Sequence, residues 1–150
     1  ERLMLLNPGF ELGSRWESIV GVEGLEAWQR DKVFSFAMPS TGEPIVVPWS
    51  FVEQTRAQSG TPIVCMPTCV LHGRHDKVVP SSLSQQFVTH VPICKLVLLE
   101  DDHALTAPES LKRIVDEALE LCCAPLLELG PARRWVVSPE GVTGSGSMTR

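Results

Sequence analysis

Three short and almost continuous apolar runs mark the core of the chain, at residues 2–6, 69–71 and 95–99. Such runs are typical of strands in a parallel sheet, which is buried on both of its faces. Helical patterns follow the second and third runs, at residues 81–90 and from Pro108 onward. The later helix has apolar residues at one-face spacing, which predicts that they face the sheet: Leu111, Ile114, Val115, Ala118, Leu119 and Cys122. The whole pattern predicts an α/β fold with about three parallel strands and flanking helices.

Residues 14–60 follow a different pattern. Two short helices are predicted at 14–20 and 24–29, a hairpin at 33–37 and 45–47, and a helix that starts at Pro48. The region also concentrates aromatic side chains, among them Trp16, Trp28, Phe34 and Trp49. Two interpretations of these four residues stay open. They form an aromatic wall that binds substrate, or they pack a small insertion together.

Composition excludes several classes of function. A chain of 150 residues that is 43% hydrophobic can bury a core as one domain. The net charge of −5 argues against a nucleic acid or an anionic membrane as the main partner, and no apolar run is long enough to span a bilayer. Five cysteines at irregular spacing form no disulfide framework, which favours a reducing compartment such as the cytoplasm.

An acid and a histidine follow the second and third apolar runs. Asp76 lies on the loop after residues 69–71, and His103 lies on the loop after residues 95–99. Open parallel sheets carry functional groups at the carboxyl ends of their strands. Asp76 is therefore a candidate for an orienting carboxylate, and His103 is a candidate for a general base.

The stretch His72-Gly73-Arg74-His75-Asp76 also suggests a metal site. Metal-binding helices present two histidines four residues apart, whereas His72 and His75 flank a glycine at a strand end. We therefore expect no metal and no cofactor. We read His72 as a hydrogen-bonded histidine at the strand end and His75 as an exposed turn residue. A metal-dependent hydrolase that uses both histidines with Asp76 stays a less favoured alternative.

The segments HGRHDKVVP (residues 72–80) and LEDDHAL (residues 99–105) resemble the C-terminal part of the α/β-hydrolase family, of the small serine esterase or thioesterase type. In that family a serine on a G-x-S-x-G turn comes first, then an acid, then a histidine. Asp76 and His103 match the last two positions. No G-x-S-x-G occurs among these 150 residues.

The resemblance implies that residues 1–13 and 61–124 form part of the hydrolase core, that residues 14–60 form a cap, and that residues 125–150 form a flexible tail. It implies a small ester or thioester substrate, with the nucleophilic serine upstream of Glu1 and a chain that is inactive alone. The alternative is a non-catalytic remnant that binds a ligand or a partner, through the cap or through a sheet edge at residues 3–6. The acyl group, the leaving group and the oligomeric state do not follow from the sequence.

Overall fold

The chain forms two compact units, which are described here from a computed structural model. The structure describes residues 1–38, 41–123 and 135–137. Unit 1 comprises residues 1–10 and 63–150, and unit 2 comprises residues 11–62. The sequence places the insertion at residues 14–60, close to the bounds of unit 2.

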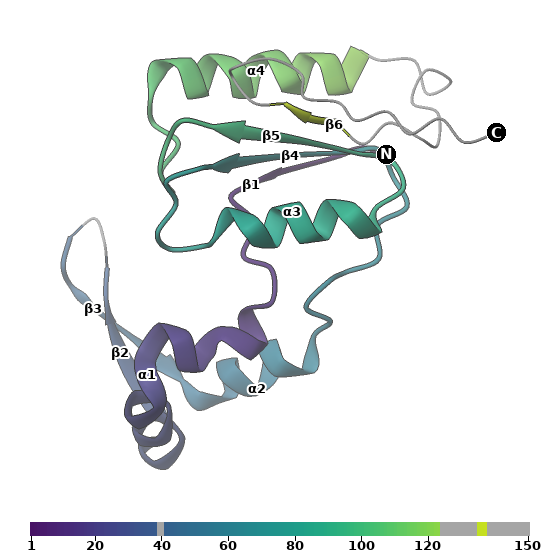
Figure 1. Ribbon diagram of the computed structural model, residues 1–150. Coiled ribbons are helices and arrows are strands. Elements are labelled where there is room, and N and C mark those ends of the chain that lie inside the picture. The colour runs from purple at the N-terminus through teal and green to yellow at the C-terminus, as the bar shows by residue number, and fades with distance from the viewer. Residues whose placement is uncertain (39–40, 124–134, 138–150) are drawn as a thin grey trace. The chain divides into compact units, whose positions relative to one another are not determined.

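Unit 1 is built on a parallel sheet with the strand order β1-β4-β5-β6 (Figure 1). Its strands are β1 (Leu3–Leu6), β4 (Thr68–Gly73), β5 (Cys94–Leu99) and the short β6 (Trp135–Val137). Leu6 is in register with Leu71, and Gly73 is in register with Leu99. The three strands expected from the apolar runs are therefore confirmed as a parallel sheet, and β6 extends it at the β5 side.

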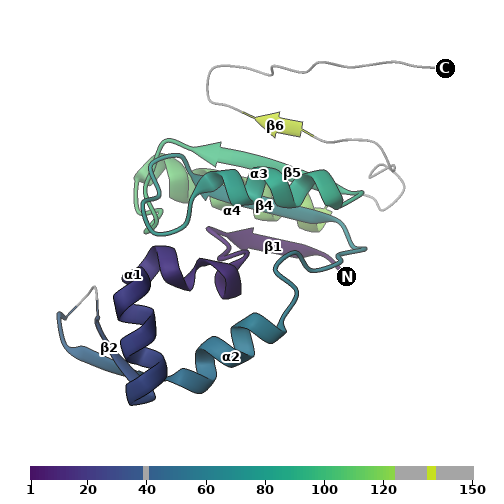
Figure 2. The same cartoon turned by 60° about the horizontal axis from the view of Figure 1, so that its bottom comes forward.

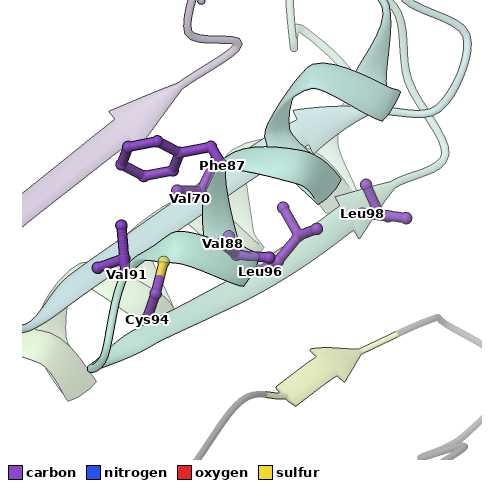
Figure 3. Packing of buried hydrophobic residues seen from close by; sticks show 7 residues of the cluster. All are labelled: Val70, Phe87, Val88, Val91, Cys94, Leu96 and Leu98. Carbon is purple, nitrogen blue, oxygen red and sulfur yellow. The ribbon is translucent and has the colours of Figure 1, made fainter. Parts of the chain in front are cut away.

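Helices α3 (Ser81–His90) and α4 (Pro108–Cys123) cover opposite faces of this sheet (Figures 1 and 2). Side chains of β4 and β5 alternate between the two faces, so each helix has its own core. On the α3 side, Phe87 packs with Val70 and Leu96 in a cluster that Figure 3 shows. On the α4 side, Ile114 packs against Leu71 and Val97. Each fully buried aliphatic side chain stabilises the fold by about 1.5–3 kcal/mol.

The apolar face predicted for α4 is only partly the face that packs on the sheet. Leu111, Val115 and Leu119 are 52%, 56% and 59% exposed, and Cys122 is also exposed. Instead, Ser110 and Glu117 are buried and Leu121 packs into the core with Ile114. The helix can turn a carboxylate inward because Lys95 Nζ and Arg113 NH2 each lie 2.7 Å from Glu117 and compensate its charge.

Unit 2 contains a kinked helix, a hairpin and a second helix. Helix α1 (Leu12–Asp31) includes both of the short predicted helices. The predicted break between them corresponds to a kink at Gly21, where φ is 76°. Strands β2 (Val33–Ala37) and β3 (Pro44–Pro48) form the predicted antiparallel hairpin, and α2 (Trp49–Ala57) follows. Phe34, Phe36 and Val47 pack against a buried core of Trp16, Trp28, Trp49 and Val52.

Two further predictions concern the ends of the chain and its relation to membranes. The flexible tail predicted at 125–150 lies outside the described residues, apart from β6.

Within the described ranges, no helix combines the length and the apolar character that crossing a membrane requires.

Candidate active site

The carboxyl ends of β4 and β5 bring two functional loops together. The strands are parallel neighbours and end in register at Gly73 and Leu99, so the chain leaves both of them at the same edge of the sheet. Main-chain hydrogen bonds then join the loops, from Arg74 N to Leu99 O (2.8 Å) and from His75 N to Asp101 O (3.0 Å). The sheet thus places the loop with Asp76 against the loop with His103.

Asp76 is held rigidly by its own loop. Its Oδ1 accepts hydrogen bonds from the main-chain N–H groups of Val78 and Val79, both at 2.8 Å. Its Oδ2 accepts a hydrogen bond from Nδ1 of His103 at 2.7 Å. The Asp76 side chain has no exposed surface. Both carboxylate oxygens are therefore occupied, and one of them faces the histidine.

The electrostatic surroundings keep Asp76 ionised. Burial raises the pKa of this carboxyl group, but the hydrogen bonds from Val79 N–H, His103 and Val78 N–H outweigh burial and hold the pKa below its ordinary value of 3.8. Asp76 therefore carries its negative charge at neutral pH, as an orienting carboxylate requires.

His103 has one bonded and one available nitrogen. An ionised carboxylate only accepts hydrogen bonds, so Nδ1 carries the proton that it donates to Asp76. No hydrogen bond joins Nε2 to any residue in the described part of the chain, and the side chain is 44% exposed. This tautomer leaves the Nε2 lone pair free to accept a proton.

The loop around His103 is fixed by neighbouring carboxylates and a strained residue. Asp101 accepts hydrogen bonds from the main-chain N–H groups of Asp102 and Ala107. Asp102 accepts one from Ala104 N–H. Leu105 is buried although its φ is 52°, a conformation that is unfavourable for a leucine. Such strain persists where the surroundings enforce it, often at functional sites.

The two other histidines of the predicted motif are used in structural contacts. His72 is fully buried, with Nδ1 2.7 Å from Ser84 Oγ and Nε2 2.9 Å from the Val79 carbonyl. His75 is exposed and bonds to Glu100. His72 is thus a hydrogen-bonded histidine at the strand end, and His75 is an exposed turn residue. Among the described residues, no three His, Cys, Asp or Glu side chains are grouped as a metal site requires.

Gly73 allows the two loops to approach each other. A Cβ atom on this residue would lie against the main-chain oxygens of Asp101 and Asp102, closer than real Cβ atoms come. A glycine is therefore required at this strand end, because the main chains of the two loops come into close contact beside the Asp76–His103 pair.

Asn7 belongs to the site but was not among the predicted residues, because the sequence suggests only a strand break there. Its side chain is buried and bonds to main-chain atoms of both loops, at Gly73, Asp102 and His103. Its φ is 42°, which asparagine tolerates better than most residues. An asparagine directly after a buried strand is the signal that could have identified it.

A hollow of about 350 Å³ lies beside His103. Besides His103 and Asn7, its walls are mostly apolar: Leu6, Ala104, Leu105, Leu111 and Ile114. Leu6, at the end of the edge strand β1, is 48% exposed. The imidazole thus borders an apolar space between β1 and α4.

The four aromatic residues predicted for substrate binding all lie in unit 2. Trp16, Trp28 and Trp49 are buried in its core. Trp16 Nε1 donates to Thr55 Oγ1, and Trp28 Nε1 donates to the Val47 carbonyl. Phe34 is partly exposed and packs against Trp28 with the ring planes tilted by 33° and a centroid distance of 5.3 Å. These contacts support the packing interpretation, and a substrate wall stays a prediction.

Solved structures are similar to this chain in fold. No protein-family model and no curated protein matches the sequence. A candidate hydrolase from Agrobacterium vitis S4 has a TM-score of 0.70 at 23% identity, over 81% of this chain and 49% of that one. Mouse alpha/beta hydrolase domain-containing protein 10 has a TM-score of 0.64 at 20% identity, over 81% and 51%. Est1E from Butyrivibrio proteoclasticus has a TM-score of 0.61 at 18% identity, over 82% and 52%.

The chain spans about half the length of these three proteins. At these identities the likeness concerns the fold. It agrees with the parallel sheet and its flanking helices. The chain therefore has part of the α/β-hydrolase fold.

Proposed function

We propose that this chain supplies the acid and the base of a serine hydrolase that cleaves carboxylic esters or thioesters. The observation that carries the proposal is the 2.7 Å hydrogen bond from His103 Nδ1 to the buried carboxylate of Asp76, at the carboxyl ends of two neighbouring parallel strands. The nucleophilic serine would lie on polypeptide outside these 150 residues, since no G-x-S-x-G occurs among them.

Each residue has a defined role in this proposal. Asp76 fixes the tautomer of His103 and stabilises the imidazolium that forms during the reaction. Nε2 of His103 takes the proton of the serine hydroxyl as the oxygen attacks the substrate carbonyl. The same nitrogen then gives that proton to the leaving alcohol or thiol. Water repeats the cycle on the acyl-enzyme and releases the acid.

The edge strand β1 and the hollow beside His103 are where the serine would approach. A further parallel strand added to β1 would end at the same edge as Leu6, Gly73 and Leu99. A serine on the turn after that strand would enter the space between β1 and His103. The apolar wall of the hollow would then border the acyl group.

Unit 2 is proposed as a cap that affects substrate choice. Trp16, Trp28 and Trp49 are buried, so we propose that they affect substrate choice indirectly, by stabilising the fold of this unit. Phe34 is partly exposed and is the better candidate for direct contact with substrate. The five free cysteines support a reducing compartment such as the cytoplasm.

The test is hydrolysis of p-nitrophenyl butyrate and of a matched thioester by the protein as its native host produces it. Asp76→Asn should lower kcat by about 10⁴-fold and His103→Ala by about 10⁶-fold, the losses seen when the acid or the base of a triad is removed. His90→Ala, at the exposed end of α3, is the matched control and should keep full activity. If residues 1–150 alone hydrolyse the ester in a manner that depends on His103, the proposed position of the serine is wrong.

A second candidate function is a non-catalytic module that binds a partner. Exposed apolar side chains on β1 and α4 of unit 1 favour this function, because a partner that covered them would remove apolar surface from water. They are Leu6, Leu111, Val115 and Leu119. It predicts a stable dimer or complex that protects these residues, together with a native protein that does not hydrolyse esters. Activity that depends on His103 would exclude it.

A further inference from the structure

Asn7, at the end of β1, forms hydrogen bonds to the end of β4 and to the loop after β5, through its main-chain N–H and its side-chain carboxamide. Its main-chain N–H donates to the Leu71 carbonyl at 3.0 Å, which continues the pairing of β1 with β4. Its Oδ1 accepts the N–H of Gly73 at 2.8 Å. Its Nδ2 donates to the carbonyl of His103 at 2.8 Å and to that of Asp102 at 3.3 Å. The loop after β5 is thus fastened to the end of β4 by a residue at the end of β1.

The chemistry of these contacts requires an asparagine. The site presents one N–H donor and two carbonyl acceptors, and a carboxamide offers the complementary acceptor and two donors. An aspartate has the same shape but only accepts, so it would face the carbonyls of His103 and Asp102 without a proton to share. The positive φ of 42° further restricts the position to residues such as asparagine, aspartate and glycine.

One of the hydrogen bonds of Asn7 is made to the main chain of His103, the proposed base. Asn7 holds the carbonyl of His103, and Gly73 begins the loop that carries Asp76 three positions later. The separation between His103 Nδ1 and Asp76 Oδ2 depends on how these two loops sit against each other. Because Asn7 is buried, no water replaces these bonds freely, and losing them leaves buried main-chain groups without partners.

We propose that Asn7 is a positioning residue, which sets the His103 loop against the Asp76 loop so that the hydrogen bond between the two side chains forms. The inference rests on the function proposed above. It adds a third residue to the machinery of the site, one that acts through the main chain and does not touch the substrate.

The experiment follows imidazole N–H protons of the ¹⁵N-labelled chain by NMR, with solvent exchange as the readout. His103→Gln assigns the His103 Nδ1–H signal by its loss, and Asp76→Asn shows the exchange rate of that proton without the carboxylate. Asn7→Asp keeps the shape and the backbone conformation but removes the donors, and Asn7→Gly keeps the backbone conformation alone. Both should speed exchange of the His103 proton by roughly tenfold or more, since several hydrogen bonds are lost. The main-chain amide protons that pair β4 with β5 at Val70 and Leu96 serve as the internal control and should keep their protection.

Each outcome decides the inference. If the His103 proton stays equally protected in both Asn7 variants while Asp76→Asn exposes it, Asn7 has no positioning role and the proposed function stands. If the amide protons that pair β4 with β5 lose protection to the same extent as the His103 proton, Asn7 is a general stabiliser of the sheet and the inference is wrong. If Asp76→Asn itself leaves the His103 signal unchanged, the contact on which the proposed function rests is absent.

Discussion

The His103 imidazole donates to the Asp76 carboxylate at 2.7 Å, although 27 positions separate the two residues along the chain. One helix and one strand lie between them, so the right-handed return of the chain to a neighbouring parallel strand creates the contact. Gly73 and Asn7 then fix how closely the two loops approach.

Gly73→Ala should destabilise unit 1 by about 1–3 kcal/mol, because the added methyl group meets the carbonyls of Asp101 and Asp102 and pushes the loops apart. Urea unfolding measures the change. Gly9→Ala is the matched control, since an added Cβ there has no heavy atom within 4 Å, and it should shift stability by less than about 0.5 kcal/mol. Equal effects of the two substitutions would mean that the loops do not approach at Gly73 as described.

Stability should fall on acidification, with Asp76 as one of the groups responsible. Its pKa is lower in the folded state than the ordinary 3.8, so the folded state binds fewer protons than the unfolded state. Asp76 contributes its full stabilisation at a pH above the ordinary pKa of 3.8. This stabilisation is lost as the pH falls below 3.8 and then below the lower pKa of the folded state. Asp101, whose pKa is lowered by hydrogen bonds from Ala107 N–H, Ser110 and Asp102 N–H, acts in the same direction.

Urea midpoints between about pH 6 and about pH 2 measure this dependence. The Asp76→Asn variant lacks one of the groups, and its stability should decline less steeply over the acid range. An identical decline in the variant and the parent chain would show that the hydrogen bonds to Asp76 do not depress its pKa.

Trp28→Ala should destabilise unit 2 by about 3–5 kcal/mol, the cost of removing a fully buried aromatic ring from a core. In a Trp135→Phe background, which removes the tryptophan of unit 1, the fluorescence of Trp16 and Trp49 during urea unfolding reports on this unit. Val46→Ala, at a position that is 62% exposed, should change stability by less than about 0.5 kcal/mol. A Trp28→Ala variant as stable as the parent would return Trp28 to the substrate-wall interpretation.

The sequence predicted the parts of the fold that depend on local pattern. Continuous apolar runs identified β1, β4 and β5 because these strands are covered on one or both faces, and the loops after β4 and β5 carried recognisable motifs. The burial of α4 was harder to predict. Its apolar spacing indicated one face, whereas ion pairs between Glu117 and both Lys95 and Arg113 allow the neighbouring face to pack on the sheet.

Asn7 could not be assigned from sequence because its partners are distant. Gly73 is 66 positions away, and Asp102 and His103 are 95 and 96 positions away. A local sequence pattern does not predict which strands become neighbours. In the sequence, a polar residue that joins three strand ends therefore looks the same as one that only ends a strand. The same holds for Gly73, whose close contact with Asp101 and Asp102 exists only once β4 and β5 are paired.

The most direct test of the central claim is to label the protein, as its native host produces it, with a fluorophosphonate probe and to sequence the labelled peptide. Such probes react with a serine that a neighbouring histidine activates. We predict one labelled serine, located outside residues 1–150, and loss of the label in the His103→Ala variant. A labelled serine within these residues, or labelling that persists without His103, would contradict the account.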